Sequence, residues 1–182
     1  DFTRALGTGA GQVQLIGGVG AGFSAFGAPI NINFGGAGAT VAWGSSTFNP
    51  GIFTLNGGNA THVATLVNNL DLGGEQRYIR LDGSASGTNR AVIGAISGDI
   101  SNGSIVKRGG GILVFDNAKS YENGTIIHEG ELWLTGAGTA GANVAGNDIQ
   151  INSGALLKIE SPGNIGSRQA IILQNGDVNT PA

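Results

Sequence analysis

A short unit of strands and glycine-rich corners recurs along this chain and constrains its fold more than any other feature. Its clearest copy, residues 104–135, reads SIVKRGGGILVFDNAKSYENGTIIHEGELWLT. The core of the unit, a glycine followed by alternating apolar residues, begins at Gly51, Gly111 and Gly130, and a shifted copy begins at Gly154. The last three of these glycines are 19 and 24 residues apart. A strand–turn unit repeated about every 20 residues is typical of a solenoid, in which each unit buries its apolar face against the next.

The composition is that of a chain made of strands and turns. The 182 residues include 35 glycines, and only 12% of the residues are charged, which is about half the usual share. The glycines have no Gly-X-Y period, which excludes collagen, and 40% hydrophobic residues in short alternating runs exclude a disordered chain. Glycine also interrupts every window of helical apolar spacing, at a cost of about 1 kcal/mol each. We therefore expect an all-β protein.

The alternating runs predict short strands that end at Gly, Asn, Asp or Ser. The predicted strands are 12–16, 30–34, 39–43, 51–55, 62–67, 77–82, 91–96, 104–107, 112–116, 125–128, 131–135, 148–152, 155–160 and 169–174. Strands about 4.8 Å apart, stacked coil on coil, give a parallel β-helix (β-solenoid) of about eight coils. We expect residues 1–182 to form a single β-solenoid domain, with irregular coils over 1–100 and regular coils over 101–182.

Strand alternation predicts which side chains face the interior of the coils. Successive side chains of a strand point to opposite faces, so Ile112, Val114, Glu131 and Trp133 are expected to point outward. The predicted interior residues are Leu113, Phe115, Ile127, Leu132, Leu134, Leu156 and Ile159.

Four Asn-Gly pairs leave a second architecture open. These pairs usually form type I′ hairpin turns, which would give an antiparallel sandwich or barrel, but glycine also permits the left-handed corners of a solenoid. The repeated unit favours the solenoid. The pairs are Asn56-Gly57, Asn102-Gly103, Asn123-Gly124 and Asn175-Gly176.

Several classes of function are disfavoured by charge and residue usage. The net charge is −3, and the nine basic residues are scattered without forming a stripe, so nucleic acid is not an expected partner. The absence of cysteine removes disulfides, thiolate metal sites and cysteine nucleophiles. No stretch is apolar and long enough to predict stable insertion in a membrane as a helix. The first residues, DFTRALGTG, lack the regions of a signal peptide, which suggests a mature product or an excised piece.

Two groups of polar residues are candidates for a metal site and for a glycosidase site. His128, Glu129 and Glu131 form the densest cluster, but Glu129 and Glu131 share a face by parity while His128 points away, so a metal ion would lack ligands. Glycosidase chemistry needs two carboxyl groups roughly 5–9 Å apart. The candidate carboxylates occupy separate turn-like contexts, and Arg77 and Arg80 are expected to pair on the surface with two of them, Glu75 and Asp82. These candidates are Asp71, Glu75, Asp82 and Asp99.

The triple glycine and the two tryptophans are better explained by structural roles than by ligand binding. Gly109-Gly110-Gly111 lacks the following helix of a phosphate-binding loop, and corners explain these glycines better. Trp43 and Trp133 are possible sugar-stacking platforms, although tryptophan on a strand more often serves packing. The sequence therefore predicts no catalytic, cofactor-binding or metal-binding residue, no cofactor, and a protein that is not an enzyme.

The unit at 104–135 resembles the passenger-associated transport repeat of autotransporters, approximately K-x-G-x-G-x-L-x-L-x-G-x-N-x-Y-x-G-x-T-x-I-x-x-G-x-L-x-L. It departs from that pattern at Phe115, Asn117 and Lys119 and carries an extra residue at Glu122-Asn123. The opening of the chain also looks like a segment that precedes this repeat in large surface proteins of planctomycete-type bacteria. The matching residues are Lys107, Gly109, Gly111, Leu113, Tyr121, Gly124, Thr125, Ile127, Gly130, Leu132 and Leu134.

The resemblance implies a right-handed parallel β-helix in a secreted or surface-displayed bacterial passenger, with a repeat linked to export and folding. We therefore expect a non-enzymatic structural or adhesive module, with end-to-end assembly into filaments as an option. Its expected partners are other copies of itself or further coils of a longer chain, with surface polysaccharide as a further option. The alternative is a carbohydrate-binding or polysaccharide-cleaving β-helix.

Overall fold

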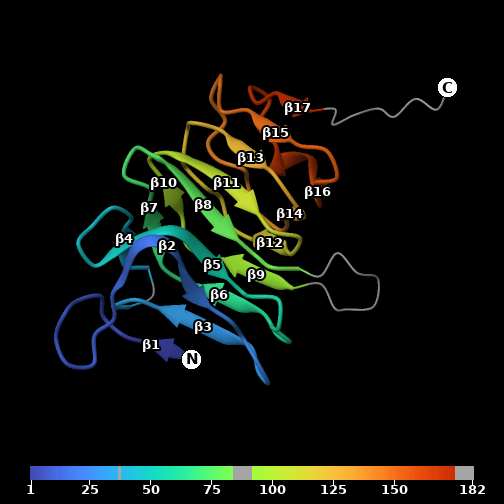
Figure 1. The fold of residues 1–182 in the computed structure, drawn as a ribbon. Coiled ribbons are helices and arrows are strands. Elements are labelled where there is room, and N and C mark those ends of the chain that lie inside the picture. Colours follow the sequence, from blue (N-terminus) through green and yellow to red (C-terminus); the bar gives the residue numbers. More distant parts are fainter. Residues whose placement is uncertain (37, 84–91, 175–182) are drawn as a thin grey trace.

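The computed structural model describes residues 1–36, 38–83 and 92–174, and its regular secondary structure is almost entirely β-strand (Figure 1). Every strand pair in these ranges is parallel. This finding rules out the antiparallel sandwich. Asn56 and Asn102 adopt left-handed backbone angles, with φ of 84° and 56°, and the strands on either side of each lie in different sheets, so these residues form corners rather than hairpin turns. The pair Asn175-Gly176 lies outside the described residues.

The strands form three sheets, two large and one small. The first sheet has the order β1 (Phe2–Thr3), β3 (Ile30–Asn33), β6 (Ala64–Leu66), β9 (Ile93–Ile96), β12 (Ile112–Phe115), β14 (Glu131–Leu134), β16 (Leu156–Ile159). The second has the order β2 (Leu15–Phe23), β5 (Phe48–Leu55), β8 (Gln76–Arg80), β11 (Ser104–Arg108), β13 (Thr125–Ile127), β15 (Ile149–Ile151), β17 (Ile171–Leu173). The third has the order β4 (Thr40–Ala42), β7 (Asn69–Asp71), β10 (Ile100–Ser101), and one 3-10 helix, η1, spans Pro162–Asn164.

Within each sheet the strands follow one another in sequence order, so the chain leaves a sheet and returns beside the strand it left (Figure 1). We call each such passage a circuit. Early circuits are long: Ile30 pairs with Ala64, and Ala64 pairs with Gly94. Later circuits are shorter, since Ile112 pairs with Glu131, 19 residues on. This strand order is consistent with the predicted β-solenoid.

All fourteen predicted strands overlap strands of the structure, although residue 91 of one prediction lies outside the described ranges. Three strands were missed: β1, β7 and β10 have only two or three residues each, too few for alternation to be visible. The prediction also ended β2 at residue 16, because the run GGVGAG carries almost no side chains to mark a strand that continues to Phe23.

The interior consists of rows in which apolar side chains of paired strands lie one above another. The longest row of the first sheet is Phe2, Ile32, Leu66, Ile96, Phe115, Leu134 and Ile159. Stacking of this kind removes each side chain from water, which is worth roughly 1.5–3 kcal/mol per residue. The interior positions predicted for Leu113, Phe115, Ile127, Leu132 and Leu134 are confirmed by their burial.

The predictions that Leu156 and Ile159 are interior residues are wrong. Leu156 is 51% exposed because it is in register with Glu131 on the outer face, and Leu157 takes the interior place beside Leu132. Ile159 is in register with the interior residue Leu134, yet it is 40% exposed because β16 is the last strand of its sheet. Of the predicted outward residues, Ile112 is buried, and Val114, Glu131 and Trp133 are partly buried.

Long circuits enclose a wide interior, and aromatic side chains fill it. Phe48 lies at the centre of this cluster, with ring centroids 5.5 Å from Trp43, 5.5 Å from Phe53 and 5.8 Å from Phe34. The shorter later circuits are filled mainly by Leu and Ile. Side-chain volume therefore follows circuit length, as close packing requires.

Buried asparagines hold the corners between circuits. The Asn147 Oδ1 atom accepts a hydrogen bond from the Gly124 N–H at 2.7 Å, and its Nδ2 atom donates to the carbonyls of Tyr121 and Ala142 at 2.9 and 2.7 Å. Such bonds satisfy backbone groups that the corner removes from the strand ladders. The buried corner asparagines are Asn56, Asn68, Asn147 and Asn164.

We expect Asn147→Ala to lower the free energy of unfolding by about 2–4 kcal/mol, because three buried backbone groups lose their partner. Chemical denaturation monitored by circular dichroism measures the change. The matched control is Asn152→Ala, since Asn152 is half-buried and its side chain accepts a hydrogen bond from the Gln150 side chain. Equal losses in both variants would contradict the role assigned to Asn147.

Candidate functional site

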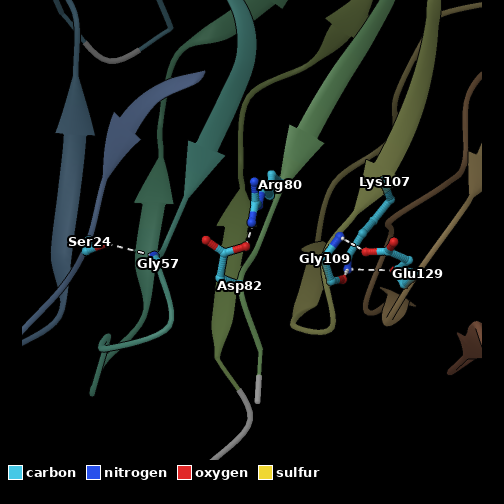
Figure 2. Close-up of polar contacts among 7 residues, drawn as sticks. All are labelled: Ser24, Gly57, Arg80, Asp82, Lys107, Gly109 and Glu129. Carbon is cyan, nitrogen blue, oxygen red and sulfur yellow. Dashed lines mark hydrogen bonds and ion pairs between the residues drawn. The ribbon is translucent and has the colours of Figure 1, made fainter. Parts of the chain in front are cut away.

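A buried lysine on β11, Lys107, extends its ammonium group into the corner that follows the strand. Lys107 lies in an interior row between Ile79 and Ile127, where an apolar residue is expected, and its side chain is fully buried. Its Nζ atom donates to the carbonyl of Gly109 and, at 2.8 Å, to the carbonyl of Glu129 (Figure 2). The ammonium group therefore joins the corners of two successive circuits.

The corner depends on close approach of the backbone to this ammonium group. Gly130 has a φ of 67°, and a Cβ atom there would lie 2.6 Å from Lys107 Nζ and 2.5 Å from the carbonyls of Gly109 and Gly111. The Gly109 N–H donates to the Glu129 carboxylate at 2.9 Å (Figure 2). The Glu129 carboxylate thus occupies the backbone N–H group that a phosphate would have to bind. This geometry agrees with the interpretation of residues 109–111 as a glycine corner.

Burial lowers the pKa of two lysines, Lys107 and Lys119. Loss of hydration lowers the pKa of Lys107 to about 8, while the nearby carboxylates of Glu129, Glu131 and Asp82 oppose the shift. Burial likewise lowers the pKa of Lys119 to about 8, against Asp116 and Asp99. Lys119 donates to the Asn117 carbonyl at 2.9 Å, and its Nζ atom lies 5.2 Å from the centroid of the Phe115 ring.

A hollow of about 450 Å³ lies on the outer side of the Lys107 corner. Its polar side chains come from Glu129, Glu131 and Ser153, and Leu156 forms an apolar border. Trp133 stands beside it on the outer face of β14: the indole N–H donates to the Glu131 carboxylate at 2.6 Å, and Lys158 Nζ lies 3.9 Å from the ring centroid. Lys158 therefore covers one face of the Trp133 ring, and Glu131 holds its N–H edge.

The cluster at 128–131 does not converge on a metal position. Glu129 and Glu131 both line the hollow, in agreement with the predicted shared face, and His128 Nδ1 lies 3.6 Å from Glu129 Oε1 at an exposed position. In the described part of the chain, no group of three or more His, Asp or Glu side chains is placed to hold a metal ion.

Two of the four candidate carboxylates, Asp71 and Asp99, accept hydrogen bonds from segments more than 20 residues away. Asp71 accepts from the Gly73 N–H and from Asn102 Nδ2, at 2.9 and 3.0 Å. Asp99 accepts from the backbone N–H and the hydroxyl group of Ser120, at 2.9 and 2.6 Å. Glu75 uses its backbone carbonyl, which accepts from the Ser104 N–H at 3.2 Å.

One of the two arginine pairings is confirmed. Arg80 forms an ion pair with Asp82 (Figure 2). The pairing predicted for Arg77 is wrong, because its guanidinium group donates instead to the carbonyls of Leu72 and Trp43, at 2.9 and 3.2 Å.

The two tryptophans differ in role. Trp43 is a core residue whose indole N–H donates to the Pro50 carbonyl at 2.9 Å, so a sugar-stacking role for Trp43 is wrong. Trp133 is partly exposed on the outer face and is the one described tryptophan that a ligand can reach.

The last strands of both large sheets form an open apolar end. Among the strands that the structure describes, β16 and β17 pair on one side only, with β14 and β15. Ile171 is 44% exposed and Leu173 is 72% exposed, and β17 contains no charged residue. Natural edge strands are usually protected by charges, proline or bulges, and β17 has none of these.

The sequence matches no protein-family model, and comparisons with curated proteins and with solved structures give no match. Over the residues that the structure places, no helix has the length and apolar character needed to cross a membrane.

Sequence reasoning missed two features of the site. The interior position of Lys107 was visible in principle, since it shares the parity of Ile105 in the strand SIVKR, but a charged residue is normally assigned outward. The corner asparagines could not be recognised, because the sequence does not show which backbone groups a corner leaves unpaired.

We expect the free energy of unfolding to rise between pH 8 and 10. The folded protein loses protons from Lys107 and Lys119 near pH 8, whereas the unfolded chain keeps them to about pH 10.5, so the cost of burying charge is relieved as the pH rises. Each lysine contributes about 2 kcal/mol over this range. Above pH 10 the trend is opposed, because burial raises the pKa of Tyr121 far above its usual value.

Denaturation curves at each pH test this dependence. Lys107→Met and Lys119→Met should each remove about half of the rise, and Lys158→Met, at an exposed position, should leave it unchanged. A free energy of unfolding that stays flat from pH 8 to 10 in the unmodified chain would contradict the assignment.

Proposed function

We propose that this chain is a right-handed parallel β-helix that serves as a non-enzymatic structural or adhesive module of a secreted or cell-surface bacterial protein. Right-handed winding is supported by the parallel strand order, since crossovers between parallel strands of one sheet are right-handed in about 98% of cases. Each circuit is then one coil of the helix, and seven strands in each large sheet are close to the predicted eight coils.

The observation that carries the proposal is the open end at β16 and β17. Interior rows run through the stack and reach this end with apolar side chains still exposed. Coils of a solenoid are stabilised mainly by their neighbours, so an uncovered coil is suited to receive another. A module that continues or joins a rod is therefore favoured over an isolated globular unit.

The Lys107 corner offers a physical explanation for part of the pattern shared with the passenger-associated transport repeat. Lys107, Gly109 and Gly130 all belong to the matching residues, and all three meet at one buried corner. A corner that demands a lysine and two glycines gives a reason for this pattern within a β-helix. The resemblance supports an exported passenger, and that assignment is part of the proposal.

Surface display tests the proposed role. The chain is placed between a secretion signal and an established translocator barrel in a Gram-negative host, with a known passenger as positive control. We expect the chain to reach the cell surface, to be accessible to antibody on intact cells, and to resist mild protease. Leu132→Asp, which puts a charge in an interior row, should abolish protease resistance, while Glu131→Asp on the outer face should not. Retention of the unmodified chain in the periplasm, with the control displayed, would contradict the proposal.

A carbohydrate-binding or polysaccharide-cleaving role is the second candidate, and the hollow beside Trp133 favours it. Titration of a Trp43→Phe variant with a panel of oligosaccharides isolates the fluorescence of Trp133. The structural role predicts no saturable change and no cleavage product. A saturable change that Trp133→Ala removes would support carbohydrate binding instead.

A further inference from the structure

We propose that the open end binds a second copy of this chain head to tail, with β16 and β17 of one copy pairing in parallel with β1 and β2 of the next. This inference deepens the proposed structural role and rests on it. Four observations support a second copy as the occupant: the continuity of the interior rows, the charges beside them, the apolar residues with which the rows begin at the opposite end, and the absence of charge, proline and bulge from β17.

The interior rows define one register. In the first sheet the row that begins at Phe2 ends at Ile159. Placing Phe2 of a second copy beside Ile159 continues that row by one step. In the second sheet the row that begins at Ala21 ends at Leu173, so the same arrangement places Ala21 beside Leu173. Both sheets can therefore continue with apolar residues facing the interior.

Charges on both sides of the Phe2 position agree with this register. Asp1 precedes Phe2 and Lys158 precedes Ile159, so their side chains would be neighbours on the outer face. Glu160 follows Ile159 and accepts a hydrogen bond from the Gly136 N–H at 2.6 Å, and Arg4 would lie one residue beyond the position level with Glu160. Charges of opposite sign would thus lie on both sides of one apolar contact, an arrangement that favours one register over shifted ones.

The opposite end of the stack begins the same interior rows. β1 and β2 are the first described strands of their sheets and pair with β3 and β5. Phe2 and Ala21, the first residues of the two rows, are partly buried and pack against the apolar core. Apolar rows that reach both ends allow one copy to add to the next along a single direction, which gives an open, heterologous assembly.

Mixing two cysteine variants tests the register, since the chain has no cysteine of its own. Thr3 would lie level with Glu160 of the neighbouring copy, at the strand spacing of about 4.8 Å, which a disulfide can bridge. We expect Thr3→Cys mixed with Glu160→Cys to give a disulfide-linked heterodimer under mild oxidation. Thr3→Cys mixed with Thr135→Cys should not, because Thr135 lies one strand deeper in the stack. Dimers that form only between two Thr3→Cys chains would overturn the proposal.

Sedimentation velocity and electron microscopy test assembly itself. We expect oligomers whose length grows with concentration, a weakening of at least tenfold in Lys158→Glu, and recovery in the Asp1→Lys, Lys158→Glu double variant. A chain that is monomeric at all concentrations, or a double variant no better than the single one, would overturn the head-to-tail interface. Surface display is scored separately, so loss of assembly with retained display would refute this inference while leaving the proposed structural role standing.

Discussion

The structure depends on apolar side chains that lie in register from one strand to the next. Each circuit carries only a few interior residues, too few to form a core alone, and each gains its burial from the circuits on either side. Parallel pairing at a constant register makes this possible, because it keeps the interior face of every strand aligned with that of its neighbour. A shift of one residue in the pairing register would turn the interior side chains of a whole strand outward. The two adjacent leucines of β16 show this: Leu157 pairs with the interior residue Leu132, and Leu156 pairs with Glu131 on the outer face.

Several polar groups within this apolar stack serve the corners, whereas the Thr125 hydroxyl on β13 pairs with the hydroxyl of Tyr121. Asn56, Asn68, Asn147 and Asn164 satisfy backbone groups that leave the ladders, and Lys107 serves the same purpose with an ammonium group. The lysine is the costlier solution, as its lowered pKa records. In return it joins two corners at once, which a shorter amide side chain at that position in the strand could not reach.

The repeat and strand alternation were sufficient to predict the all-β class, every long strand and five of the seven interior residues named in the regular coils. Leu156 was misassigned because LLKI contains two adjacent leucines, which leaves the parity of the strand undecided. Ile159 was misassigned because the sequence shows its face but not that β16 is the last strand of its sheet. The Lys107 corner was hidden for a different reason: hydrogen bonds to carbonyls of distant residues leave no periodic signal in the sequence.

In-register parallel stacking is tested most directly by engineered disulfides within one chain. Ala95 and Val114 are neighbours in the outer row of the first sheet, whereas Thr65 and Val114 are separated by one strand. Neighbouring strands lie about 4.8 Å apart, within the range of a disulfide, and twice that distance is outside it. The account predicts that Ala95→Cys with Val114→Cys forms an intramolecular disulfide on oxidation and that Thr65→Cys with Val114→Cys does not. A disulfide in the second pair alone would contradict it.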